Sequence, residues 1–340
     1  MNSSNSSGGG GGGESGGQAS NSSEGGGRLF TGNDPVRLSV TTALAQIFVW
    51  PFVYIDLFMF VVFLKRHVLR AEARYMLFAQ TLIADTAFLL STNFVVITYQ
   101  VFLLLPVRAC LPLALLMGGL THVSPTTIVA MCVERYVAIC LPLRHVHIFS
   151  PGRTLLVIAL VWLIAFSKPF IDFMLFLSYV TQSYFDRPAF CYYEIILLED
   201  WHMIMRGNLF ILNYVLVLLI LAFCYGSIMH VARRASGQNK QAASKGQRTL
   251  LFHVLQLVMC TLEVTGPLIE ARVLKTGNVN TYLIVRYFNF LAFSVFSRAM
   301  SPLVYGLRDE KFNAGMRYYA RCGMSQVSGV DEKPNARPDV

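Results

Sequence analysis

Three ionisable residues lie deep inside long apolar stretches of this 340-residue sequence: Asp56, Asp85 and Arg298. Each is nine to eleven residues from a basic residue at the end of its stretch, which corresponds to about 14–17 Å along a helix. The three therefore lie at a similar depth if the stretches are helices that begin at one surface. A charge in apolar surroundings is costly, so such residues usually pair with one another and mark a functional site.

The stretch from Cys110 to Tyr136 carries reactive side chains at both of its ends. Cys110 and Arg135 are 25 residues apart, or about 37 Å in a helix, which is enough to place them on opposite sides of a membrane. One end offers a thiol for a disulfide, and the other carries the adjacent charged residues Glu134 and Arg135. Taken alone, Arg135 is also consistent with an arginine that reaches toward lipid headgroups.

Seven apolar runs must position these residues. Hydrophobic residues make up 54% of the chain and charged residues only 14%, a composition unlike that of soluble domains. Each run is long enough to cross a bilayer core of about 30 Å as a helix. The predicted spans are 39–64, 75–99, 110–136, 154–178, 203–230, 248–272 and 281–305. The sequence therefore predicts an all-α membrane protein, a seven-transmembrane helix bundle with its termini on opposite sides.

The orientation follows from the basic residues between the runs. They gather in the connections after the first, third and fifth runs and in the tail: Lys65, Arg66, Arg70, Arg74, Arg144, Arg153, Arg233, Arg234, Lys240, Lys245, Arg248, Arg308, Lys311, Arg317 and Arg321. The opposite connections hold Glu194, Glu199 and Asp200, with fewer basic residues. The positive-inside rule then places the N-terminus outside. The net charge of +9 reflects this asymmetry and the anionic inner leaflet of the membrane, and a nucleic-acid partner is not expected.

The cysteines divide by their expected side of the membrane. Five lie in the runs or the tail, where thiols stay reduced: Cys132, Cys140, Cys224, Cys260 and Cys322. Only Cys110 and Cys191 are expected outside. We therefore expect them to form a disulfide that holds the second outer loop against the third run.

Motifs in the third, sixth and seventh runs resemble those of one receptor family. Residues 134–145 read ERYVAICLPLRH, similar to the Asp-Arg-Tyr-Val-Ala-Ile-Cys-x-Pro-Leu-x-His run of odorant receptors. Residues 245–254 read KGQRTLLFHV, which resembles their Lys-Ala-x-x-Thr-Cys-x-x-His-Leu. Residues 301–309 read SPLVYGLRD, which resembles Asn-Pro-x-x-Tyr with Ser301 for Asn. Over residues 40–320 the chain thus resembles a rhodopsin-class G-protein-coupled receptor of the fish-type odorant receptor family.

The resemblance implies roles for these motifs. In that class the acid before the arginine restrains it at rest, and Arg135 would face the G protein once the helices open. Pro302 kinks the seventh helix and would let Tyr305 swing inward, opposite Tyr225. The residues expected to act in coupling and activation are Glu134, Arg135, Tyr136, Leu141, Pro142, Leu143, Tyr225, Lys245, Thr249, His253, Pro302 and Tyr305. His253 alone would also fit an interfacial histidine.

The resemblance also gives the three buried ionisable residues a common cavity. Asp85 resembles the second-helix aspartate that normally holds a sodium ion in this class, where the first, second and seventh helices meet. We expect Arg298 to occupy this cavity and pair with Asp85, with Asp56 nearby, so that no metal is needed. The alternative is that Arg298 reaches lipid headgroups.

In this class the ligand lies in the outer third of the bundle. The expected lining is Met117, Gly118, Thr121, His122, Tyr193, Leu209, Phe210, Asn213, Thr261, Glu263, Val264, Thr265, Leu268, Tyr287, Leu291 and Ser294. Any one of these would also fit ordinary packing between helices, and Glu263 either meets a cationic ligand or His122 or sits neutral. Met117 stands where amine receptors carry an aspartate, which argues against an amine receptor.

The chain is expected to have three parts. Residues 1–36 are a Gly/Ser-rich extracellular tail, disordered and glycosylated at Asn2, Asn5 and Asn21. Residues 37–306 form the transmembrane receptor domain, and residues 307–340 the cytoplasmic tail. In the tail, apolar residues at helical spacing predict a short amphipathic eighth helix on the inner leaflet: Phe312, Met316 and Tyr319. Cys322 is a candidate lipidation site.

These expectations together describe a chemosensory receptor of the plasma membrane, in olfactory cilia if the resemblance holds. A small-molecule odorant would bind from outside and activate a heterotrimeric G protein of the stimulatory olfactory type. Neither enzymatic activity nor a cofactor is expected. Two alternatives stay open: a non-olfactory receptor of this class for a peptide or lipid, and a secondary transporter, although no internal repeat supports the latter.

Overall fold

The computed structural model describes residues 35–101, 103–191, 193–196, 200–235, 279–306 and 312–319, and a few positions between 255 and 273. Within these residues five long helices dominate: α2 (Pro35–Lys65), α4 (Ala73–Gln100), α5 (Val107–Cys140), α7 (Pro151–Tyr179) and α8 (Asp200–Ala235). Each contains 24 to 34 residues that are apolar enough to cross a membrane. The prediction that the first five runs are long apolar helices is confirmed.

The seventh predicted run is also helical, in three successive pieces. These are α10 (Val279–Asn289), a π-helical segment η3 (Phe290–Val295) and α11 (Phe296–Gly306). A π-helical turn widens a helix locally and is frequent at functional sites, and this one ends just before Arg298. The sixth predicted run, 248–272, lies almost wholly outside the described residues, so the complete seven-helix bundle stays a prediction.

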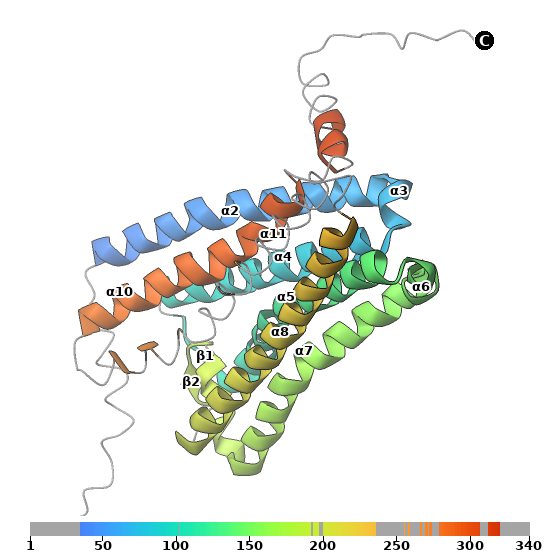
Figure 1. Cartoon of the computed structure of the whole chain (residues 1–340). Coiled ribbons are helices and arrows are strands. Elements are labelled where there is room, and N and C mark those ends of the chain that lie inside the picture. The colour runs from blue at the N-terminus through green and yellow to red at the C-terminus, as the bar shows by residue number, and fades with distance from the viewer. Residues whose placement is uncertain are drawn as a thin grey trace, which may run out of the picture.

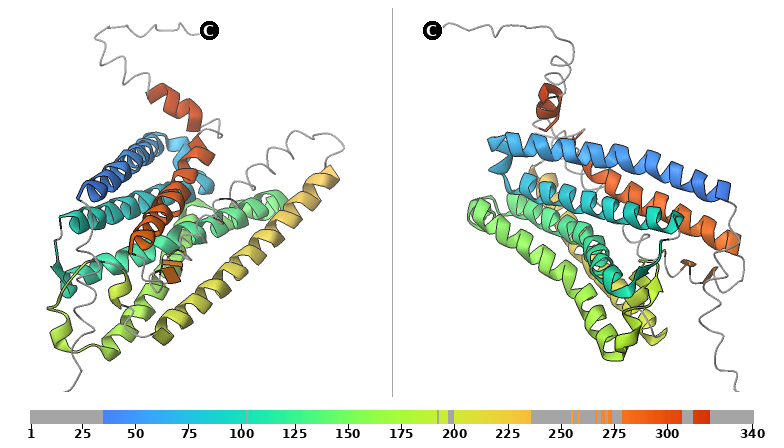
Figure 2. Two further views of the ribbon diagram at one scale, coloured as in Figure 1. Left: turned by 90° about the vertical axis from the view of Figure 1, so that its left-hand side faces the viewer. Right: turned by 180° about the vertical axis from the view of Figure 1, so that it is seen from behind.

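Helix α5 occupies the centre of the arrangement and packs against α4, α7 and α8 (Figure 1). Helix α2 packs on α4, and both η3 and α11 contact α2. Seen from behind, α10 and α11 run beside α2 (Figure 2). Residues of the first, second and seventh runs are therefore brought together, and α5 links them to the rest of the molecule.

Short elements connect the long helices. The helices α3 (His67–Arg70) and α6 (Pro142–Ile148) follow the ends of α2 and α5. The connection before α5 contains β1 (Leu105–Pro106), which pairs in antiparallel fashion with β2 (Pro188–Ala189). Two 3₁₀ helices, η1 (Gln182–Tyr184) and η2 (Tyr193–Ile196), flank β2. Pro142 and Pro151 stand in the first turns of α6 and α7, where a missing backbone donor costs nothing.

A helical segment of the tail packs on the bundle through its apolar residues. Residues 312–319 are helical, and Phe312 is completely buried. The Phe312 ring lies 5.5 Å from the ring of Phe78 and 6.0 Å from that of Tyr75, measured between centroids. Phe312 thus joins the largest apolar cluster of the molecule. That this helix lies on a membrane stays a prediction.

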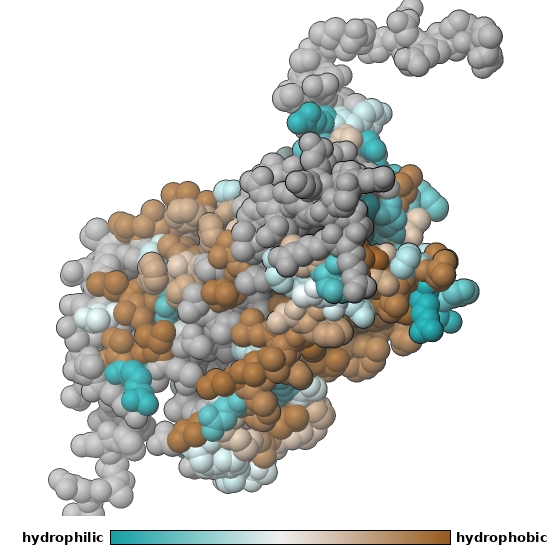
Figure 3. Space-filling model, viewed as in Figure 1, coloured by the Kyte–Doolittle hydropathy of each residue, from teal (hydrophilic) through white to brown (hydrophobic). Residues whose placement is uncertain are grey.

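The outer helices expose apolar side chains. Only 22% of the apolar window of α7 and 24% of that of α8 are buried, against 61% in α4 and 56% in α5. Leu163 of α7 and Leu212 and Leu219 of α8 are each more than 60% exposed. Hydrophobic residues cover the face that these helices present (Figure 3). A continuous apolar surface of this kind is unfavourable in water, and a lipid environment removes the cost.

Candidate functional site

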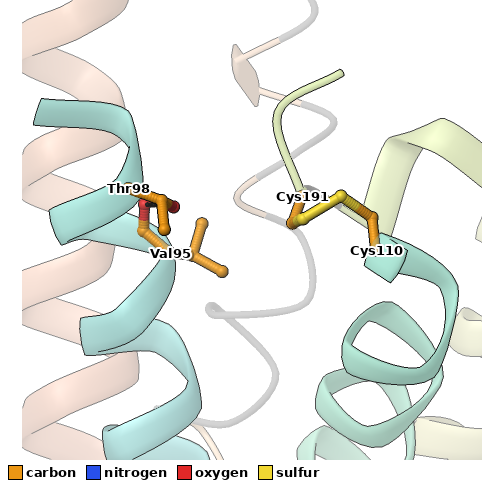
Figure 4. Close-up of a disulfide and its surroundings, with 4 residues drawn as sticks. All are labelled: Val95, Thr98, Cys110 and Cys191. Atoms are coloured by element: carbon orange, nitrogen blue, oxygen red, sulfur yellow. Dashed lines mark hydrogen bonds between the residues drawn. A yellow bond between two sulfur atoms is a disulfide. The ribbon is translucent and has the colours of Figure 1, made fainter. Parts of the chain in front are cut away.

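The disulfide predicted from the sequence is present between Cys110 and Cys191, whose Cα atoms are 4.8 Å apart (Figure 4). Cys110 opens the first turns of α5, and Cys191 follows β2. Both cysteines are buried against Val95 near the end of α4. The bond ties the loop before α8 to the start of the central helix, as expected.

The same loop is fixed by further contacts. Val107 donates its backbone N–H to the Arg187 carbonyl at 3.0 Å, and Arg108 forms an ion pair with Asp186. Phe176 at the end of α7 is fully buried beneath the rings of loop residues. The connection between α7 and α8 therefore forms a packed cap over one end of the described bundle.

The structure places Asp85 and Arg298 against each other. Arg298 Nε lies 3.8 Å from Asp85 Oδ1, and the two side chains are 2% and 1% exposed. Ser124 of α5 donates its hydroxyl to the same Asp85 oxygen at 2.5 Å. Arg298 Nη1 donates to the Ser294 carbonyl at 3.0 Å. The guanidinium also lies 3.4 Å from the centroid of the Phe88 ring. A buried ion pair thus joins α4 to α11, and the Ser124 hydrogen bond adds α5 to the same cluster.

Asp56 of α2 is the third of these buried ionisable residues, but it makes none of these bonds. It is 1% exposed, and neither carboxylate oxygen has a hydrogen-bond partner among the described residues. Asp85 lies close enough to act on it electrostatically. No group of three potential metal ligands is found among the described residues.

The C-terminal end of α5 holds a second charged cluster. The side chain of Glu134 is only 5% exposed and lies 3.0 Å from His145 Nε2 and 3.6 Å from Arg135 Nε. His145 belongs to α6, so α6 folds back toward the end of α5 and contacts Glu134. Tyr136 packs its ring against Phe223 of α8 at 5.5 Å. Glu134 therefore contacts both Arg135 of α5 and His145 of α6.

Helix α6 presents apolar residues outward beside this cluster. Leu143 is 91% exposed and Val146 is 73% exposed. They lie beyond the apolar window of α5 and before that of α7. Exposed apolar side chains that lie next to each other, outside the apolar helices, are typical of a surface that binds a partner.

The remaining predicted coupling residues are less informative. Tyr225 is 36% exposed on α8 and Pro302 is buried, whereas the Tyr305 side chain, Lys245, Thr249 and His253 lie outside the described residues.

The predicted ligand residues are only partly brought together. Gly118 and His122 are buried on α5, and Met117 packs beside the disulfide. Thr121 donates its hydroxyl to the Met117 carbonyl at 2.9 Å, which commits that donor to its own helix. Tyr287, Leu291 and Ser294 are half-buried along the seventh run, and Asn213 is half-buried on α8.

Leu209 is not brought to the others. It lies on the same face of α8 as Leu212 and Leu216, and all three are more than half exposed. The buried residues of this part of α8 are instead Tyr214 and Val217, which are three residues apart and are therefore neighbours on one face of the helix. The other predicted positions lie outside the described side chains: Tyr193, Phe210, Thr261, Glu263, Val264, Thr265 and Leu268.

A polar network between three helices was not expected from the sequence. Gln80 of α4 donates to Thr127 of α5 at 2.5 Å and accepts from the Trp162 indole of α7 at 2.8 Å. A further link joins the seventh run to the sixth, where Asn289 donates to Glu270 at 3.0 Å. Buried side-chain networks of this kind fix the register of helices. The signal in the sequence that predicts such networks is the presence of polar residues inside apolar runs.

Comparison with known proteins agrees with this geometry. The model of the family described as 7 transmembrane receptor (rhodopsin family) matches residues 56–305. Odorant receptor 131-2 of Danio rerio is 35% identical over 279 residues, which cover 82% of this chain and 85% of that protein. Growth hormone secretagogue receptor type 1 of Sus scrofa is 24% identical over 232 residues, 58% of this chain and 57% of that protein. Melanopsin of Phodopus sungorus is 24% identical over 229 residues, 64% and 48% of the two chains.

The family match covers well over half of the chain, and the relative from Danio rerio extends over most of it. The family consists of receptors rather than enzymes, and the exposed apolar helices suit a multi-pass protein of the plasma membrane. The chain therefore belongs to the rhodopsin family of seven-transmembrane, G-protein-coupled receptors and is similar to the odorant receptors of fish.

Proposed function

We propose that the chain is an odorant receptor in which a small molecule, binding from outside, activates a heterotrimeric G protein. The observation that carries this proposal is the inner end of α5, where buried Glu134 holds Arg135 beside the exposed apolar residues of α6. This arrangement combines a restrained arginine with an open docking face. The 35% identity to a protein named as an odorant receptor supports the class of ligand.

Activation follows from a shift between two arrangements of the helices. A ligand that binds the open arrangement more tightly raises its population. In that arrangement Arg135 leaves Glu134, and Tyr225 and Tyr305 close on it from the two walls. Leu141, Pro142 and Leu143 then contact the G protein, together with the start of the sixth helix at Lys245, Thr249 and His253. The G protein is of the stimulatory olfactory type, and the receptor resides in olfactory cilia.

The ligand site lies in the outer third of the bundle, beneath the loop held by the disulfide. Its supported lining consists of the inward-facing positions of α5, α8 and the seventh run: Met117, Gly118, His122, Asn213, Tyr287, Leu291 and Ser294. The packed cap over this end favours a small ligand, because a tightly held loop restricts the opening through which a long peptide would enter.

The whole chain forms a seven-helix bundle with its N-terminus outside. Residues 1–36 extend outward and carry glycans at Asn2, Asn5 and Asn21. Residues 307–340 lie in the cytosol, and the helix at 312–319 rests at the inner leaflet. The basic residues at the end of α2 and in the connection that follows α5 support this orientation.

Expression in a cell line that carries the stimulatory olfactory G protein tests the proposal. Amino acids, amines, bile acids and steroids are applied, and cyclic AMP is measured at matched surface levels of receptor. We expect one of these classes to raise cyclic AMP in cells with the wild-type receptor and not in cells with Arg135→Ala. A response to peptides alone would reject the odorant function while keeping the receptor family.

A further inference from the structure

Two charged residues of α7 take no part in the coupling motifs or in the buried cluster around Asp85. Lys168 and Asp172 lie in the apolar run of this helix, where the only other charged residue, Arg153, stands in the first turn. They come eleven and seven residues before Tyr179, which is roughly 16 and 10 Å from the end of α7 that leads into the packed cap. Charged residues at such a depth in a membrane are rare and usually mark sites that bind charged or polar groups.

Helical spacing places both side chains on the face of α7 that packs against α5. Val161, Ala165 and Phe176 are the buried residues of one stripe along α7. Lys168 and Asp172 belong to the same stripe, seven and eleven residues after Val161. Both side chains are half-buried. They therefore point toward the interior of the bundle rather than straight into lipid.

The apolar contacts on either side show which part of α5 lies opposite. Ala165 shares an apolar cluster with Leu120 of α5, and Phe176 shares another with Ala114. The two charged residues come between Ala165 and Phe176 along α7, so they lie opposite residues 115–119 of α5. This stretch reads LLMGG, without a charged or hydrogen-bonding side chain. Here α5 offers an apolar surface, and α7 offers one ammonium and one carboxylate a single helical turn apart.

The two charges lie beside the proposed ligand site. Met117 and Gly118, two of its lining residues, belong to the stretch of α5 opposite Lys168 and Asp172. A ligand with one charge would match only one of these side chains and would add a net charge to apolar surroundings, which is costly. A ligand with both charges matches both side chains and leaves the site neutral.

We propose that Lys168 and Asp172 recognise the charged groups of the ligand, and that the ligand is an α-amino acid. Lys168 donates to its carboxylate, and its ammonium donates to Asp172, both in charge-assisted hydrogen bonds. The side chain of the amino acid lies against residues 115–119 of α5. The inference rests on the proposed function, because it names the class of ligand that the same site takes.

Ligand analogues test the proposal on the wild type. Purified receptor in lipid discs is titrated with each of the standard L-amino acids, and binding is measured as the rise in melting temperature. We expect at least one amino acid to bind. Its amine analogue, which lacks the carboxylate, and its acid analogue, which lacks the ammonium, should each bind at least about tenfold more weakly, because each loses a charged hydrogen bond. Binding by none of the amino acids, or equal binding of the analogues, would overturn the proposal.

Variants assign each charge to its residue. Lys168→Met should no longer distinguish the amino acid from its amine analogue, and Asp172→Asn should no longer distinguish it from its acid analogue. Arg153→Met removes a charge at the other end of α7 and is the matched control, with wild-type affinity. Wild-type preferences in the two single variants would contradict the proposed contacts.

The double variant Lys168→Asp with Asp172→Lys separates recognition from a structural role. It keeps both charges one turn apart but reverses their order along the helix. We expect it to reach the cell surface as the wild type does and to bind the amino acid at least about tenfold more weakly. Wild-type affinity in the double variant would show that the two residues only stabilise the helix and would overturn the proposal.

The cyclic AMP assay separates this inference from the proposed function. A response to steroids or bile acids, with none to amino acids, would reject the amino-acid ligand and keep the odorant receptor. Binding of an amino acid without any change in cyclic AMP would keep the ligand class and reject activation of the stimulatory G protein.

Discussion

Arg298 and Arg135 are each held by one acid, but their surroundings differ. Arg298 and Asp85 are almost inaccessible, whereas the Arg135 side chain is 34% exposed. A partly exposed pair is weak and easily exchanged, while a buried pair is costly to break. The position of Arg298 beside Asp85 could be predicted from the depth of both residues along their helices and from the family resemblance. The contact between His145 and Glu134 could not be predicted, because it requires the segment after Cys140 to fold back as a helix.

Breaking the Asp85–Arg298 pair from one side should destabilise the receptor strongly. Asp85→Ala leaves a buried guanidinium without its acid, which costs about 3–5 kcal/mol. We expect greatly reduced surface expression and thermal stability. Adding Arg298→Met removes the unpaired charge and should restore part of both. Surface labelling and unfolding of the two single variants and the double variant measure the coupling, and additive effects would show that the pair makes no contribution.

Among the elements, the five long helices of the described residues could be predicted because each is an uninterrupted apolar run. Three features could not. The π-helical segment η3 has no sequence signal of its own, the seven-residue helix α6 is too short for a pattern, and Leu209 lies on an exposed part of α8. In a nearly uniform apolar helix, the face that packs is decided by neighbouring helices rather than by its own pattern.

The contact between α5 and α7 depends on a small residue at Gly119. A Cβ atom there would clash with the ring of Phe166. This ring is held by stacking on Trp162, which is bound to Gln80. Gly119→Ala should therefore cost about 1–3 kcal/mol of stability. Gly152→Ala, where a Cβ meets nothing within 4 Å, is the matched control and should be nearly neutral. Similar melting temperatures for the two variants would contradict the close packing.

The exposed face of α6 should be required for coupling but not for folding. Leu143→Asp places a charge in the centre of the proposed G-protein contact, and we expect at least a tenfold loss of nucleotide exchange on the G protein at unchanged surface expression. Val68→Asp, at a residue of α3 that is 61% exposed, serves as the control. An equal loss in both variants would show that coupling responds to any added charge at this end of the receptor.

For the whole molecule, the account depends on how α5 crosses the membrane. The disulfide at Cys110 and the cluster at Glu134 lie at opposite ends of a 34-residue helix. The apolar surfaces of α7 and α8 suit lipid between these ends. Ligand recognition on one side and G-protein activation on the other both require this geometry.

Cysteine labelling with a membrane-impermeant maleimide in intact cells tests this crossing directly. Ser183→Cys lies in the exposed loop after α7, and Val146→Cys lies on the exposed face of α6. The account predicts that Ser183→Cys is labelled in intact cells and Val146→Cys only after permeabilisation, each above the background of the wild type. Labelling of both variants in intact cells would place the two ends of α5 on one side and contradict the receptor function.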